Sequence, residues 1–346
     1  MENKLRVIAL VILVALVVVV LMLDVRISEA FKDAGIGKNP LEYPLVAVVV
    51  GLFVNVVFRL LHIHKLVAPY LNTEFYLKVG LVLLGARVSF GDVMAIGAGG
   101  LVQAVIMVVS VFGFTWWLAG KVGLDDKLRA VMSAAVSICG VSAAIAAAGA
   151  VLAKKEHVSY IACLVIITAI PLMAIMPGIA HSLGLSPQVA GAWFGGNIDT
   201  TAAVVGAGTI HGEEAQAVAT VVKMAQNVMI GVAAFALALY FTVVVERKSG
   251  ERPSAMVIWQ RFPKFVLGFM LLSVLTTIGA LSGGVVGDIK TVGKWFFAAA
   301  FIAMGLEFDV SALKSMGVKP VLVYLAATVF NTLLALVVAS VIFGGA

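Results

Sequence analysis

Charged residues are scarce in this sequence. Aspartate, glutamate, lysine and arginine make up 12% of its 346 residues, whereas 62% are hydrophobic, and the mean hydropathy is +1.12. So little charge cannot cover a soluble domain, and the composition therefore excludes that class and indicates an integral membrane protein. The net charge of +6 is ordinary for a membrane protein whose inside loops carry lysine and arginine, and it does not predict nucleic-acid binding.

Sustained alternation of polar and apolar residues is also absent, which excludes a transmembrane β-barrel. Continuous apolar runs such as VIALVILVALVVVVLML predict membrane-spanning helices instead. The sequence therefore predicts an all-α, multi-pass protein of the cell inner membrane with about 10–11 transmembrane helices. The runs lie near residues 5–23, 43–61, 74–90, 98–119, 128–153, 157–180, 187–208, 215–245, 258–282, 290–305 and 320–343.

Cysteine and the motifs of enzymes are rare or missing. The two cysteines, Cys139 and Cys163, both lie in apolar runs, so no disulfide framework is expected. The five histidines do not cluster as metal ligands do, and HExxH, GxSxG and Walker motifs are absent. We therefore expect no metal site, no cofactor and no enzymatic activity.

Basic residues gather in five groups between the apolar runs. With eleven crossings all five fall on one side, which places the N-terminus in the cytoplasm and the C-terminus outside. Lys154 and Lys155 fall on the other side. They are either a tolerated exception or the mark of a neighbouring re-entrant segment, and the sequence leaves both explanations open. The groups are Lys4 and Arg6; Arg59 and Lys65; Lys121, Lys127 and Arg129; Arg247, Lys248, Arg252, Arg261 and Lys264; and Lys314 and Lys319.

A weak internal repeat indicates the class of membrane protein. LVLLGARVSFGDV (residues 81–93) aligns with FIAMGLEFDVSAL (residues 301–313), and an odd number of segments separates the two copies. They would therefore run in opposite directions, and inverted repeats are typical of secondary transporters. We expect one transmembrane domain over residues 1–346, with repeat-like halves at about 43–180 and 187–346 and an extra N-terminal helix at 1–23.

Two apolar segments carry small and polar residues at mid-depth and predict two broken helices. They are Ala134–Val151 and the stretch GGNIDTTAA (residues 195–203). Unwound backbone at membrane depth is tolerated only where it is buried in protein or lines a cavity, and a half-helix N-terminus offers N–H groups to an anion. Close packing through small residues is the alternative for the first segment. The candidate substrate-binding residues are Cys139, Gly140, Ser142, Asn197, Thr200 and Thr201, with Arg87 as a fixed cation.

Asp199 and Lys223 are the charges that most need explanation. A charge at the bilayer centre costs at least ~2.5–3.5 kcal/mol, so each needs a partner, a proton or an ion. We expect the two to face one cavity and to compensate each other, directly or through a substrate, with Gln226 and Asn227 beside them. The alternatives are a protonated Asp199 that only bonds a neighbouring helix, and a Lys223 that extends to the membrane interface.

The order of GLVLLGARVSFGDV, SICGVSAAIAAAGAV, GNIDTTAAVVGAG and VVKMAQN resembles the YeiH-like family of bacterial inner-membrane proteins, to which sulfate export is ascribed. A more distant resemblance is to the superfamily of bile acid:sodium symporters and cation:proton antiporters. The resemblance implies inverted repeats and two broken, crossing helices. By position it implies breaks at Cys139–Ala144 and Asn197–Thr201 and a membrane lysine at Lys223.

These observations predict a secondary transporter of a small anion, and the resemblance implies that this anion is sulfate or a related oxyanion or organic anion. Asp199 would couple transport to protons or sodium. The alternatives are a cation:proton antiporter and, from another class, a membrane scaffold or sensor that transports nothing. The expected partners are the anion, the coupling ion and the lipid bilayer, but no nucleic acid; a homodimer is left open.

Overall fold

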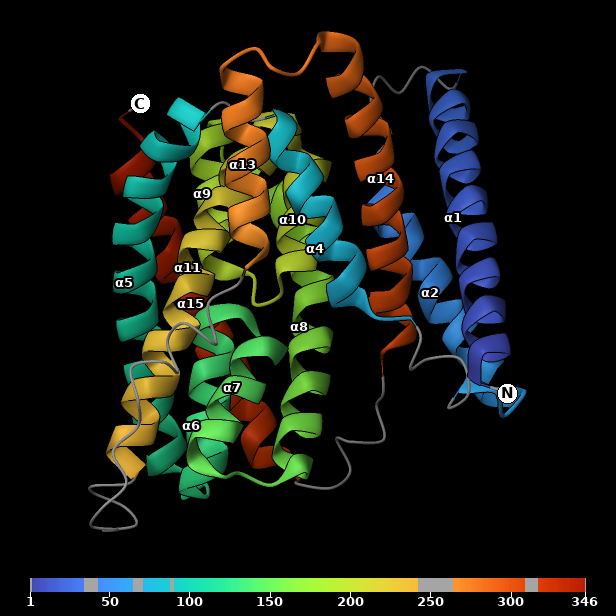
Figure 1. Cartoon of the computed structure of the whole chain (residues 1–346). Helices are drawn as coiled ribbons and strands as arrows, with labels where there is room; N and C mark the ends of the chain where they lie inside the picture. Colours follow the sequence, from blue (N-terminus) through green and yellow to red (C-terminus); the bar gives the residue numbers. More distant parts are fainter. Residues whose placement is uncertain are drawn as a thin grey trace. The chain divides into compact units, whose positions relative to one another are not determined.

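A computed structural model describes residues 2–33, 43–64, 71–87, 90–241, 264–308 and 317–345. None of these residues lies in a β-strand, and seven of the helices are long and apolar enough to cross a membrane (Figure 1). The predicted all-α, multi-pass fold is therefore confirmed. The elements are α1 (Glu2–Asp33), α2 (Tyr43–Leu60), α4 (Thr73–Leu84), η2 (Gly85–Arg87), α5 (Phe90–Lys121), α6 (Asp126–Ala134), η3 (Ala135–Cys139), α7 (Val141–Val151), α8 (Lys155–Ser182), α9 (Pro187–Asn197), α10 (Thr201–His211), α11 (Glu213–Tyr240), α13 (Phe265–Thr277), α14 (Gly283–Leu306) and α15 (Val318–Phe343).

The chain divides into two compact units. The first unit comprises Met1–Val93 and Phe265–Phe308, and the second comprises Met94–Lys264 and Asp309–Ala346. This division follows packing and does not coincide with the expected halves at 43–180 and 187–346. The single transmembrane domain and the inverted repeat therefore stay predictions.

In the first unit, α14 packs against both α2 and α4. Asn55 Nδ2 of α2 donates to the carbonyl oxygen of Gly305 over 3.2 Å. The start of α4 lies at the end of α14, because the backbone N–H of Thr73 donates to Glu307 Oε1 over 3.1 Å. Further along, Gly80 of α4 lies against Phe297. The two segments aligned in the proposed repeat thus begin in α4 and α14, which run antiparallel.

In the second unit, residues 126–151 form a re-entrant hairpin and not a crossing. Hairpin 1 consists of α6, η3, Gly140 and α7. Lys127 Nζ, near its beginning, donates to the carbonyl oxygen of Leu152, just after its end, over 3.3 Å. Both ends of hairpin 1 therefore lie at the same face of the unit, with α6 and α7 side by side (Figure 1).

Residues 187–211 form a second hairpin, which consists of α9, residues 198–200 and α10. Its first arm runs parallel to α11, because Gly191 lies against Val218 and Gly195 against Val222. Its second arm runs antiparallel to α11, since Thr201 accepts a hydrogen bond from Asn227 (3.3 Å) and Gly208 lies against Gln216. Both ends of hairpin 2 therefore lie beside the first residues of α11.

The prediction that 128–153 and 187–208 each cross the membrane is therefore wrong. Three of the arms have 11 residues, and the first arm of hairpin 1 consists of the nine residues of α6 and the five of η3. At 1.5 Å per residue, each arm reaches only about half to two-thirds of a hydrocarbon core that is ~30 Å thick. Each apolar segment is long enough for one span, but its break turns it back to the face from which it entered.

The hairpin also explains the basic residues that the sequence placed on the wrong side. Because hairpin 1 returns, Lys154 and Lys155 lie at the same face as Lys121 and Lys127. The start of α15 belongs to this face as well, because Tyr160 near the start of α8 donates to the carbonyl of Gly317 over 3.0 Å. By the positive-inside rule we expect this face to be cytoplasmic, and the ends of hairpin 2 lie at the opposite face of the unit.

Candidate functional site

The tips of the two hairpins meet in the buried centre of the second unit. Gly140 at the tip of hairpin 1 has φ of 67° and ψ of −119°, a conformation that glycine adopts without strain. A Cβ at this position would lie 3.5 Å from the carbonyl oxygen of Asp199 at the tip of hairpin 2. All residues of η3, and residues 189–199 of hairpin 2, are buried. The two predicted breaks are thus brought together.

Three successive carbonyl oxygens at the end of the first arm of hairpin 1 accept hydrogen bonds from side chains of other helices. Asn331 Nδ2 donates to Val136 (3.3 Å), Gln226 Nε2 to Ser137 (2.8 Å) and Lys223 Nζ to Ile138 (2.5 Å). These carbonyls lie in η3, a π-helical turn closed by the hydrogen bond from Gly140 N to Ala135 O (2.9 Å). A π turn changes the backbone hydrogen-bond pattern and is frequent at functional sites. At membrane depth its carbonyls need donors, and α11 and α15 supply them.

Two of the same side chains also reach hairpin 2. Asn331 Nδ2 donates to the carbonyl of Asn197 over 2.8 Å, and Gln226 Nε2 lies 3.5 Å from the carbonyl of Gly196. Each amide therefore joins the ends of the first arms of both hairpins. This arrangement fixes the two tips to each other and to α11 and α15.

Lys223 is 1% exposed, so it does not extend to the membrane interface. Its ammonium donates to the carbonyl of Ile138 and to Gln226 Oε1 (2.8 Å). Its hydrogen-bond partners are therefore neutral oxygens and not Asp199. The carbonyl end of a helix carries a partial negative charge, which compensates the ammonium in part. Direct pairing of Lys223 with Asp199, one of the expected arrangements, is not the one observed.

Asp199 is 1% exposed and has its own partner. The hydroxyl of Tyr324 on α15 donates to Asp199 Oδ2 over 2.5 Å. Oδ1 is buried and has no hydrogen-bond partner among the residues that the structure describes. A buried acceptor without a donor is costly, so this oxygen is free to take a proton or a cation.

The other predicted site residues lie at the tip of hairpin 2, at the tip of hairpin 1 or, in the case of Arg87, in the other unit. Thr200 caps α10 by accepting from the N–H of Ala203 (3.1 Å), and Thr201 accepts from Asn227. Asn197 Oδ1 accepts from Thr332 (3.0 Å), while Cys139 and Ser142 flank Gly140 at the tip of hairpin 1. Arg87 belongs to η2 in the other unit, and its side chain lies outside the described part of the structure.

Sequence reasoning missed the residues of α15 that complete the site. Tyr324 donates a hydrogen bond to Asp199, and Thr332 donates one to Asn197. Asn331 donates to carbonyl oxygens of both hairpins. It also missed Gln103 of α5, whose Nε2 donates to the carbonyl of Ala192 in hairpin 2 over 2.8 Å. The available signal was an isolated polar residue inside an apolar run, which in a membrane helix marks a site that needs a partner.

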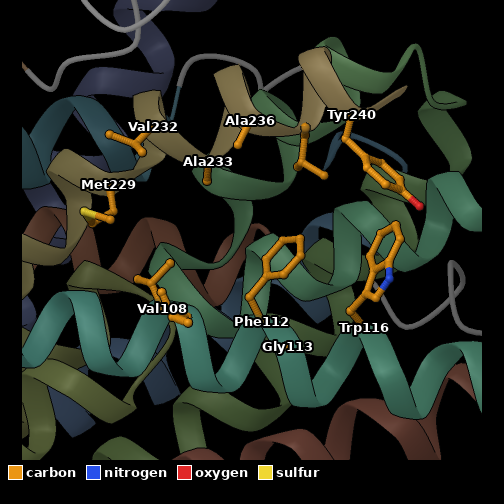
Figure 2. A pocket seen from close by; sticks show the side chains of 11 residues that line it. Val108, Phe112, Gly113, Trp116, Met229, Val232, Ala233, Ala236 and Tyr240 are labelled. Carbon is orange, nitrogen blue, oxygen red and sulfur yellow. The ribbon is translucent and has the colours of Figure 1, made fainter. Parts of the chain in front are cut away.

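A groove of about 450 Å³ lies elsewhere in the second unit, between α5 and α11 (Figure 2). Figure 2 shows Val108, Phe112 and Trp116 of α5 pointing toward Met229 and Tyr240 of α11. Apart from the indole nitrogen of Trp116 and the hydroxyl of Tyr240 its side chains are apolar, so it offers few donors to a small anion. The hairpin tips, which gather the buried charges, are therefore the candidate site.

Two re-entrant hairpins that enter from opposite faces and meet at buried charges define a multi-pass α-helical membrane protein with a transporter-like architecture. The chain belongs to the family described as conserved hypothetical protein 698, which matches residues 6–324. Its relatives carry the name UPF0324 membrane protein. The resemblance to the YeiH-like family and the multi-pass membrane localisation are thereby confirmed.

The chain is 41% identical over 317 residues to a UPF0324 membrane protein of Rhodopirellula baltica, covering 88% of this chain and 58% of the relative. It is 30% identical over 293 residues to one of Chlorobaculum tepidum, covering 83% and 80%. It is 31% identical over 260 residues to the UPF0324 membrane protein TauZ of Paracoccus pantotrophus, covering 73% and 75%. The chain spans only 51–58% of the length of the relatives from Rhodopirellula baltica and Nitratidesulfovibrio vulgaris to which it is 36–41% identical. No solved structure matches it.

Proposed function

We propose that this chain is a secondary transporter of a small anion, and that the anion passes the point where the hairpin tips meet. The observation that carries the proposal is a buried ammonium, Lys223, and a buried carboxylate, Asp199, at that point, each bonded to neutral groups. Charges at membrane depth are costly and typically mark substrate and ion pathways. A transporter would use both charges, the ammonium to bind the anion and the carboxylate to exchange the coupling ion.

The two helix N-termini at the tips favour an anion as the substrate. Helices α7 and α10 both begin there, so their first N–H groups and the positive ends of their dipoles lie at the meeting point. Side-chain capping differs between them: Thr200 caps α10, whereas no side chain caps α7. The Lys223 ammonium has three N–H groups, and the described residues supply acceptors for two of them. Sulfate, a related oxyanion or a small organic anion matches these donors.

Asp199 is the proposed coupling residue. It has one bonded and one unpartnered oxygen, so it can exchange a proton or a sodium ion without first breaking its bond to Tyr324. A change of charge at Asp199 would alter the electrostatic potential at Lys223, and thereby the affinity for the anion.

Transport by the purified chain in liposomes tests this proposal. Radiolabelled sulfate is supplied under a pH gradient, a sodium gradient or neither, with other oxyanions and small carboxylates as competitors. We expect Ser142→Leu to abolish uptake while the protein stays folded, because the leucine would cover the N–H groups that begin α7. Ser159→Leu, at an exposed position of α8, is the matched control and should retain uptake. Normal transport by Ser142→Leu, or no gradient-driven movement of any anion, would contradict the proposal.

A further inference from the structure

The ammonium of Lys223 is bonded to oxygen atoms of the kind that bind a metal cation. Where a helix is interrupted inside a membrane, the carbonyl oxygens at the end of its first half commonly bind sodium. In hairpin 1 the carbonyl of Ile138 is such an oxygen, and it lies 2.5 Å from Lys223 Nζ. The other ligand of the ammonium is Gln226 Oε1 at 2.8 Å. Carbonyl and amide oxygens are the ligand types that hard monovalent and divalent cations prefer.

The side chains around the ammonium are arranged as they would be around a bound ion. The amide of Gln226 turns its oxygen toward Lys223 and its nitrogen toward the carbonyl of Ser137. Asn331 donates a hydrogen bond to the carbonyl of Val136. The carbonyls of Val136 and Ser137, which precede Ile138, are therefore already bonded to neutral donors. Of the three successive carbonyls, the one of Ile138 is therefore bonded to the positive charge.

We infer that the Lys223 ammonium is the resident cation of this site, in the place of an exchangeable sodium ion, and that the coupling ion of the proposed transporter is therefore the proton. This inference rests on the proposed function for its second part only. The ammonium is covalently attached to α11, so it cannot leave with the substrate. A sodium ion could enter only beside a fixed charge of the same sign, which repels it.

Asp199 is then the buried acidic group, among the described residues of the second unit, that can carry an exchangeable charge. The titratable side chains that interact with it are Tyr324 on α15 and Lys223 on α11, and Cys139 on η3 interacts in turn with Lys223. Tyr324 donates to Oδ2, and Oδ1 has no partner among the described residues. One carboxylate oxygen with a single tyrosine beside it is a poor cage for sodium, which needs several oxygen ligands, but it suffices for a proton.

Cation binding to the purified protein tests the first part without any transport assay. Thermal unfolding is followed in sodium, potassium or N-methylglucamine chloride at constant ionic strength. We expect no sodium-specific shift in the wild type. Lys223→Ala, which vacates the site, should unfold at a lower temperature and should regain stability in sodium in a saturable manner. Adding Gln226→Leu removes one ligand and should abolish that sodium effect, while Lys155→Ala, at an exposed lysine, should behave as the wild type.

Two results would overturn the inference. One is a sodium-specific stabilisation of the wild type as large as that of Lys223→Ala, and the other is a folded Lys223→Ala that does not respond to sodium. Should Lys223→Ala not fold, the wild type in liposomes decides: a proton gradient should drive accumulation in sodium-free buffer, and accumulation driven by a sodium gradient at equal pH would refute proton coupling. If no anion is transported at all, the proposed function fails, whereas the sodium titration still decides the role of Lys223.

Discussion

Replacing Gly140 by alanine perturbs the tip of hairpin 1 at its most constrained residue. With φ of 67° and ψ of −119°, the position lies in a region that is almost closed to residues with a Cβ. Holding a side-chain-bearing residue in such a region costs about 1–3 kcal/mol. The new Cβ would also lie 2.7 Å from Val165 Cγ1 of α8, which real Cβ atoms do not tolerate. Relieving such overpacking costs a further ~1–3 kcal/mol.

We therefore expect Gly140→Ala to lower the free energy of unfolding by about 2–6 kcal/mol, measured by reversible unfolding in mixed micelles. A double-mutant cycle separates the two costs. Val165→Ala removes the clash but leaves the backbone conformation, so in that background Gly140→Ala should cost only about 1–3 kcal/mol.

The control is Gly178→Ala in α8, a helical glycine where an added Cβ would meet no other heavy atom within 4 Å. It should raise stability by roughly 0.5–1 kcal/mol, because alanine is the better helix former. If Gly140→Ala were as stable as the wild type, the turn at the tip would not have the conformation described. An equal cost in both backgrounds would instead show that Val165 does not close the space around Gly140.

Three further predictions use the same protein. Asn331→Leu leaves two buried carbonyls without their donor and should cost about 1–3 kcal/mol in the unfolding assay; unchanged stability would contradict the bridging role. Tyr324→Phe should cost a similar ~1–3 kcal/mol, and less in an Asp199→Asn background, so equal costs would show that the two side chains are not coupled. In a cysteine-free background, single cysteines at Gly123 and Lys154 should both react with an impermeant reagent from the cytoplasmic side only. Labelling from opposite sides would mean that residues 126–151 cross the membrane.

The helical membrane fold was predictable because its signal is local. A run of about 20 apolar residues is enough to predict a helix at membrane depth, whatever the rest of the chain does. The difference between a crossing and a hairpin is not local, because both use an apolar segment of the same length. Lys154 and Lys155 carried the sequence signal for the first hairpin, since two lysines on the outer side conflict with the positive-inside rule. Hairpin 2 has no charge pair of this kind near its end.

The site was predictable in its charges but not in its partners. Asp199 and Lys223 stand out because each interrupts an apolar segment, and the small residues around Gly140 indicate a break. Their partners, however, are a backbone carbonyl 85 residues away and a tyrosine hydroxyl 125 residues away. A carbonyl has no sequence signature, and a single tyrosine in a membrane helix is usually interpreted as an interfacial aromatic residue. Direct pairing of the two opposite charges was therefore the simplest expectation, and only the packing of α11 and α15 shows otherwise.

The bridging amides predict how the hairpins move. Gln226 and Asn331 each bond the first arms of both hairpins, so opening one tip alone would leave buried carbonyls unpaired on the other. We therefore expect the two tips to move together as one body. The test compares the native Cys139 with Thr200→Cys, one at each tip, in a background lacking Cys163. Conditions that let an impermeant thiol reagent reach one cysteine from a given side should let it reach the other from the same side. If Cys139 reacts only from the cytoplasm and Thr200→Cys only from outside, the hairpins are independent gates, and the amides do not hold them together during transport.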